Sequence, residues 1–83
     1  MAVDINEIEY SDWLVSKVNG PHKCTIDDVF DAVENYITAD WDDDPEKGRR
    51  LLVKGYTQHR RLLRVFLYPV DADAGRFRLG TAF

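Results

Sequence analysis

The spacing of apolar residues changes partway along this chain, and the change restricts the fold more than any other feature. Within residues 25–34, apolar side chains recur at i, i+3, i+4 and i+7, as Ile26, Val29, Phe30 and Val33. After Leu51 this helical period is lost, and β-rich runs separated by turn residues follow. The pattern predicts helices in the first half of the chain and a sheet in the second half.

Two helices are expected near the N-terminus, each with its own boundary residues. Ser11 is a candidate N-cap for the first, which should end at the stop signal Asn19-Gly20-Pro21. Thr25 and Asp28 form a variant of the capping box at the start of the second. We expect Phe30 to lie on the buried stripe of this second helix.

The remaining segments favour strands. A short first strand is expected near residues 5–10, and four more at residues 36–39, 51–56, 62–68 and 76–83. Residues 40–48 are expected to form an acidic turn, and residues 57–61 a hairpin loop. In the last strand, Phe77, Leu79, Thr81 and Phe83 should share one face. These elements predict a single α+β domain over residues 1–83, with two N-terminal helices packed on a mainly antiparallel sheet of four to five strands, in the order β-α-α-β-β-β-β.

The charges are segregated along the chain. Residues 1–46 contain thirteen acids and two bases, a net charge of −11, whereas residues 47–83 contain nine bases and two acids, a net charge of +7. This asymmetry indicates either a polyanionic partner such as a nucleic acid or two segments that neutralise each other within one fold. The single cysteine, Cys24, suits a reducing cytoplasm, and no apolar run or leader predicts a membrane span or secretion.

The predicted strands suggest where the basic residues gather. If Phe77 and Leu79 face the helices, the arginines between them face away, and a basic sheet face results. Guanidinium groups interleaved with tyrosines suit an RNA strand, whereas the alternative is a solvated face whose arginines pair with carboxylates. The RNA-binding candidates are Arg50, Lys54, Tyr56, Arg60, Arg64 and Arg76.

His22 and His59 are the candidate proton carriers, because imidazole is the side chain whose charge changes near neutral pH. His22 follows Pro21 in the turn between the expected helices and could instead cap or pack, and His59 could be merely exposed. No metal site is expected, because the acidic run Asp40–Asp44 lacks the glycine and glutamate of a calcium loop, and Cys24 has no partner at zinc spacing.

In this context the chain resembles BrnT, the toxin of a type II toxin–antitoxin pair with a RelE-like ribonuclease fold. The resemblance runs from Ile8 to Phe83 and rests on the order and spacing of short motifs. They are Ile8-Glu9-Tyr10, His22, Thr25-Ile26-Asp27-Asp28, Arg50 to Gly55, Arg61-Leu62-Leu63 with Val65, and Arg76-Phe77-Arg78-Leu79 with Thr81-Ala82.

The resemblance implies an endoribonuclease that cleaves mRNA without a metal or other cofactor, blocks translation, and is neutralised by a cognate antitoxin. It implies Arg61, Arg78 and His22 as catalytic residues, and His59, the other candidate proton carrier, completes the predicted catalytic set. The family continues with a basic C-terminal segment where this sequence stops at Phe83, so a weakened activity is expected. The alternative is a non-catalytic protein-interaction module on a degenerate toxin scaffold, paired with an antitoxin or with a second copy.

Overall fold

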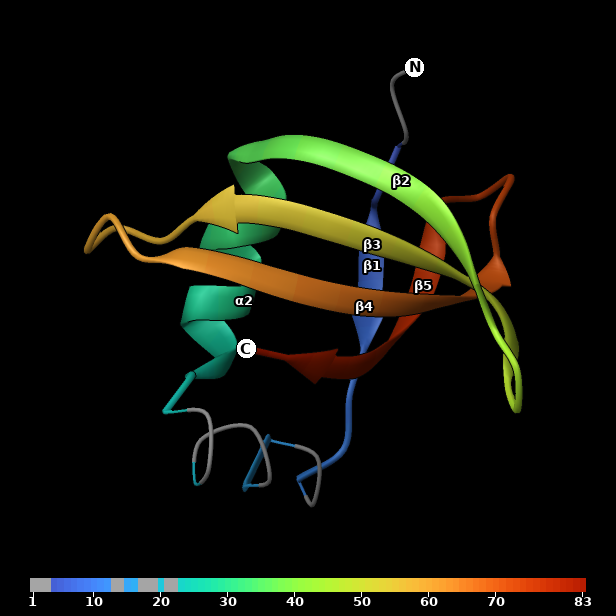
Figure 1. The fold of residues 1–83 in the computed structure, drawn as a ribbon, viewed down its shortest axis with the longest axis horizontal. Helices are drawn as coiled ribbons and strands as arrows, with labels where there is room; N and C mark the ends of the chain where they lie inside the picture. The colour runs from blue at the N-terminus through green and yellow to red at the C-terminus, as the bar shows by residue number, and fades with distance from the viewer. Residues whose placement is uncertain (1–3, 13–14, 17–19, 21–22) are drawn as a thin grey trace.

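The computed structural model describes residues 4–12, 15–16, 20 and 23–83. Five strands and one helix are assigned within these ranges (Figure 1). They are β1 (Glu7–Glu9), α2 (Ile26–Glu34), β2 (Tyr36–Asp44), β3 (Gly48–Tyr56), β4 (Leu62–Asp71) and β5 (Arg76–Ala82).

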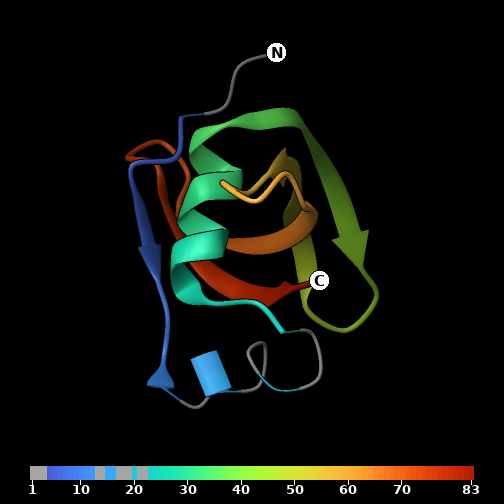
Figure 2. The same cartoon turned by 90° about the vertical axis from the view of Figure 1, so that its left-hand side faces the viewer.

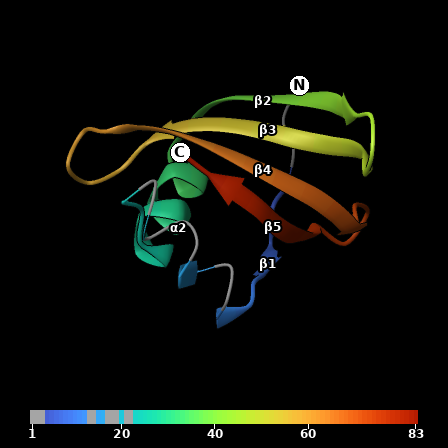
Figure 3. The same cartoon turned by 60° about the horizontal axis from the view of Figure 1, so that its bottom comes forward.

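All five strands belong to one sheet, in the order β1-β5-β4-β3-β2. Strands β2 to β5 form an antiparallel meander, and β1 pairs in parallel with β5 at the far edge. Helix α2 packs on β3 and β4, against one face of the sheet (Figure 3). We call the opposite face, which points away from α2, the open face.

The expectation of two N-terminal helices is wrong: one helix, α2, is assigned in the part of the chain that the structure describes. Much of the other expected helix, at residues 13–14 and 17–18, lies outside the described residues. Within the described ranges, α2 is the helix whose contacts with β3 and β4 form the layer over the sheet.

The capping box of α2 is confirmed. The amide of Asp28 donates to Oγ1 of Thr25 at 3.1 Å, and the amide of Thr25 donates to Oδ2 of Asp28 at 3.1 Å. Two of the backbone donors that the first turn leaves unpaired are thereby satisfied. The buried residues of α2 are Val29, Ala32 and Val33, whereas Phe30, expected in the core, is 38% exposed.

The core lies between α2 and the sheet and follows the alternation of the strands. Leu63, Val65 and Leu67 of β4 are fully buried, while the alternate residues Arg64, Phe66 and Tyr68 lie on the open face. The remaining core residues are the three buried residues of α2 and Ile8, Cys24, Leu51, Val53, Phe77, Leu79 and Ala82.

A β-bulge at Gly80 changes which face of the sheet the side chains of residues 81–83 lie on. Leu67 pairs with Leu79 but Phe66 pairs with Thr81, so Gly80 is an extra residue in β5. Ala82 is buried as a consequence, and the expectation that Thr81 and Phe83 share the face of Phe77 is wrong. The ring of Phe83 instead lies on the open face, 6.0 Å from the ring of Phe66.

The acidic turn expected over residues 40–48 is also wrong in extent, because β2 continues to Asp44 and only residues 45–47 form the turn. Aspartate is a poor strand former, so its local preference misleads here. Two contacts offset that preference: Trp41 packs on the core beside Phe77, with ring centroids 6.3 Å apart, and Asp42 lies opposite Arg50 on β3.

Candidate nucleic-acid interface

The open face carries cations and aromatic rings in neighbouring positions. The register places Lys54 opposite Arg64 and Leu52 opposite Phe66. Directly opposed residues in an antiparallel pair have Cβ atoms about 5 Å apart, so these side chains are neighbours on the face. The guanidinium of Arg64 lies 5.9 Å from the centroid of the Phe83 ring. Cation–π contacts of this kind hold both groups in place at an exposed surface.

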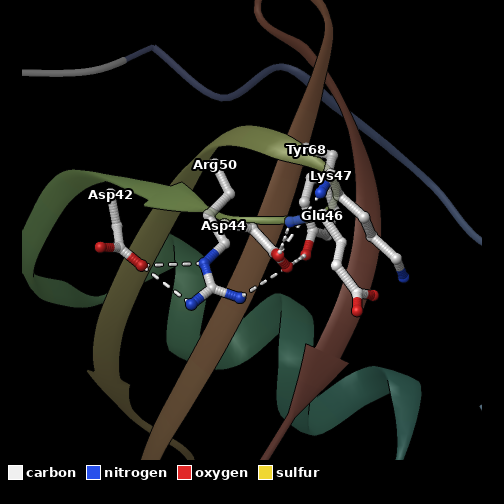
Figure 4. Close-up of polar contacts among 6 residues, drawn as sticks. All are labelled: Asp42, Asp44, Glu46, Lys47, Arg50 and Tyr68. Carbon is white, nitrogen blue, oxygen red and sulfur yellow. Dashed lines mark hydrogen bonds and ion pairs between the residues drawn. The ribbon is translucent and has the colours of Figure 1, made fainter.

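At one end of the open face, Arg50 is bound by two carboxylates (Figure 4). Its Nε and Nη2 atoms both lie 2.9 Å from Oδ2 of Asp42, and its Nη1 lies 3.2 Å from Oδ2 of Asp44. The hydroxyl of Tyr68 donates to the same Asp44 oxygen at 3.0 Å. The guanidinium also stacks on the ring of Phe66, 4.0 Å from its centroid. The charge of Arg50 is therefore paired within the fold, and its Nε, Nη1 and Nη2 groups all bind carboxylates of the same chain.

The Asp44 carboxylate is held in its ionised form by several donors. The pKa of Asp44 is lowered because the amide of Glu46 donates a hydrogen bond at 2.9 Å, with further support from the Tyr68 hydroxyl, the Lys47 amide and the charge of Arg50. The cluster therefore ties the β2–β3 turn to β3 and β4.

Arg76 is engaged in a similar way at the other edge of the sheet. Its Nε lies 3.2 Å from a carboxylate oxygen of Glu7, and its Nη2 lies 3.0 Å from one of Glu9. Both acids belong to β1, so these ion pairs join β1 to β5. The sequence left open whether the arginines of this face bind RNA or pair with carboxylates. Arg50 and Arg76 pair with carboxylates.

The opposite end of the open face is different. We define the hairpin cluster as the cations, imidazole and tyrosine at the β3–β4 loop and the strand ends beside it: Lys54, Tyr56, His59, Arg60, Arg61 and Arg64. Among the residues that the structure describes, no carboxylate lies within ion-pair distance of Lys54, Arg60 or Arg64. The Tyr56 ring is 46% exposed. The hairpin cluster thus offers positive charge and an aromatic ring to a partner.

The β3–β4 loop is held by Thr57, which is 6% exposed. Its amide donates to the carbonyl of Arg61, its carbonyl accepts from the amide of Arg60, and its hydroxyl accepts from the amides of His59 and Arg61. Arg60 takes a left-handed conformation with φ of 61°. These bonds fix the loop backbone while leaving the side chains of His59 and Arg60 exposed.

Arg61 joins the loop to the start of α2. Its Nη1 donates to the carbonyl of Lys23 at 2.9 Å, across 38 residues of sequence. The guanidinium therefore has a defined position beside the N-terminal end of α2, near the buried Cys24.

The structure does not bring the predicted catalytic residues together. Arg78 lies beside Tyr68, near the end of the sheet where Arg50 binds Asp42 and Asp44. Tyr68 lies six positions after Leu62 in β4, a distance of about 20 Å at the rise of an extended strand. Arg61 and His59 are therefore far from Arg78, and the β3–β4 loop and the β2–β3 turn lie at opposite ends of the sheet (Figure 1). His22 lies outside the described residues.

Two aromatic residues of the interface, Phe66 and Phe83, were not among the predicted site residues. Phe66 faces outward by simple alternation in β4, so its side chain could have been included from the sequence. Phe83 reaches the open face through the bulge at Gly80, and an isolated glycine inside a strand pattern is a recognised sign of such a bulge.

Neither a family model, nor a curated protein, nor a solved structure matches this chain. The resemblance to BrnT therefore stays a prediction from the quoted motifs. In the described ranges, no three His, Cys, Asp or Glu side chains are grouped so that they could hold a metal ion. Within the same ranges, no helix has the length and apolar character required to cross a membrane.

Proposed function

We propose that the protein binds single-stranded RNA at the hairpin cluster. The observation that carries this proposal is a group of cations, Lys54, Arg60 and Arg64, beside the exposed Tyr56. Among the described residues, these cations have no carboxylate partner. Cations of this kind attract phosphates, and each one that neutralises a phosphate releases counterions from the nucleic acid.

Single-stranded RNA suits this surface better than a duplex does. The open face is a sheet surface with exposed rings, and unpaired bases can stack on such rings while the backbone follows the cations. Within a duplex the bases are already stacked on one another, so Tyr56 and Phe83 would have no base face to contact.

The proposal is tested by fluorescence anisotropy with a labelled single-stranded RNA oligonucleotide. Arg64→Ala and Lys54→Ala should each weaken binding roughly tenfold, because each removes a phosphate contact. Arg78→Ala is the matched control: it removes an exposed arginine near the other end of the sheet and should change affinity less than twofold. Equal losses in all three variants would show that binding follows total charge and has no site at the hairpin cluster.

A second candidate function is cleavage of the bound RNA by a cytoplasmic toxin. One observation favours it: His59 is exposed in the same loop as Arg60 and Arg61, so an imidazole able to carry a proton lies next to phosphate-binding cations. In this proposal His59 assists attack by the RNA 2′-hydroxyl, and Arg60 and Arg61 stabilise the charge that develops on the phosphate. A cognate antitoxin would then be the protein partner, as the resemblance to BrnT implies.

Expression in bacteria without a partner gene, followed by an RNA gel, tests this second function. If the protein cleaves RNA, expression should cause growth arrest and produce RNA fragments. His59→Gln should abolish the fragments while RNA binding is retained. Binding without fragments would leave RNA binding in place and remove the ribonuclease proposal. Harmless expression with neither binding nor fragments would favour a protein-interaction module.

A further inference from the structure

A groove of about 560 Å³ lies between β1 and α2, apart from the hairpin cluster. Figure 2 shows β1 running beside α2, and residues of both elements line the groove. Its lining residues are Asp4, Ile5, Asn6, Glu7, Ile8, Phe30, Val33, Glu34 and Tyr36. A groove of this volume can hold one or two large side chains of a partner.

The base of the groove is apolar. Ile8 and Val33 belong to the core, and Ile5 and Tyr36 pack against it. The ring of Phe30 is 38% exposed and meets the ring of Tyr10 edge-on, with centroids 6.0 Å apart. Phe30 was expected in the core, but its side chain lines the groove beside the three-residue edge strand β1. An apolar surface is therefore left open beside the helix.

The rim of the groove is acidic. Asp4, Glu7 and Glu34 line it, and its lining includes no Lys, Arg or His among the residues that the structure describes. Glu7 is bound to Arg76, whereas Asp4 and Glu34 have no ion-pair partner within the described ranges. The groove thus combines an apolar base with uncompensated negative charge.

We infer that this groove binds a basic amphipathic segment of a partner protein. An apolar side chain of the segment packs on Ile8, Phe30 and Val33, and adjacent lysines or arginines pair with Asp4 and Glu34. The same carboxylates repel phosphate, so the groove does not belong to the proposed RNA surface. The inference does not depend on RNA binding, and both surfaces can be occupied together.

NMR of ¹⁵N-labelled full-length protein tests this inference with a defined probe. The probe is a ten-residue peptide of alternating leucine and lysine, and the matched peptide has glutamate in place of lysine. We expect the lysine peptide to shift the amide signals of Ile8, Phe30, Val33 and Glu34 in a saturable way, and the glutamate peptide to shift none of them.

Two charge reversals locate the binding surface. Glu34→Lys should weaken the lysine peptide at least tenfold, because it places a cation on the rim. Asp43→Lys makes the same charge change on an exposed strand residue outside the groove and should alter affinity less than twofold. Phe30→Ser should weaken binding with the charge of the protein unchanged, and circular dichroism confirms that each variant is folded.

Three results would overturn the inference. Changes in amide signals centred on Asp42, Asp43 and Asp44 would show that the lysine peptide binds to negative charge alone and not to the groove. Equal weakening by Glu34→Lys and Asp43→Lys would show the same. A rise in molecular mass with protein concentration, together with shifts at the groove in the absence of peptide, would show that a second copy of this chain fills it.

Discussion

Gly55 of β3 lies directly against the backbone carbonyl of Ala32 in α2. A Cβ atom added at Gly55 would collide with the carbonyl oxygen of Ala32, which is main chain and cannot turn aside. Both residues are buried at the contact between helix and sheet. The missing side chain at Gly55 therefore sets how closely α2 approaches β3.

Gly55→Ala should destabilise the fold by roughly 3 kcal/mol, because α2 must move off the sheet to make room for the methyl group. Urea unfolding followed by circular dichroism measures the loss. The matched control is Gly48→Ala in the β2–β3 turn, where φ is +82° and nothing lies within 4 Å of the added Cβ. That variant should lose only about 1 kcal/mol, through backbone conformation alone. A smaller loss at Gly55 than at Gly48 would contradict the role of this contact.

The hydrogen bonds and the ion pair of Asp44 should make the stability of the fold fall at acid pH. The folded-state pKa of the Asp44 carboxyl is lowered, so the ionised carboxylate stabilises the fold above the unfolded pKa of about 3.9. This stabilisation is lost as the pH falls through the lowered, folded-state pKa. We expect the fall in Tm between about pH 6 and pH 2.5 to be smaller in Asp44→Asn than in the wild type. Asp43→Asn, at an exposed neighbour, should leave the fall unchanged. Identical pH profiles for all three proteins would contradict the prediction.

Cys24 should be unreactive in the folded protein. The thiol is fully buried, its Sγ donates to the carbonyl of Ala82 at 3.9 Å, and burial raises its pKa, although Arg61 acts in the opposite direction. Since the thiolate is the nucleophile, reaction with a disulfide reagent at pH 7.5 should be at least a hundred times slower in buffer than in denaturant. Equal rates would mean that the junction between α2 and the end of β5 is open.

Local sequence patterns predicted some features of this fold well. The β-rich run at residues 62–68 predicted the strand β4, and the pair Thr25 and Asp28 located the start of α2. Both predictions rest on interactions between residues a few positions apart. They succeeded because nothing distant in the chain competes with them.

The errors arose where distant contacts decide the structure. Four aspartates between residues 40 and 44 favour a turn locally, but Arg50 and Trp41 stabilise them as a strand. The bulge at Gly80 moves Phe83 to the open face, and Phe30 is exposed beside the three-residue strand β1. The candidate site changed for the same reason. Arg50 and Arg76 pair with carboxylates on neighbouring strands, whereas Lys54 and Arg64 have no such partner in the part of the chain that the structure describes.

The proposed RNA site should respond differently to loss of charge and loss of an aromatic ring. For single strands, the slope of log K against log salt concentration is about −0.7 per neutralised phosphate, so Lys54→Ala should make the slope shallower by roughly 0.7. Tyr56→Ala removes a stacking surface worth about 1–3 kcal/mol and should weaken binding at least fivefold without changing the slope. Anisotropy titrations between about 50 and 300 mM salt separate the two effects. A shallower slope in Tyr56→Ala, or an unchanged one in Lys54→Ala, would mean that RNA does not contact these residues in the assigned roles.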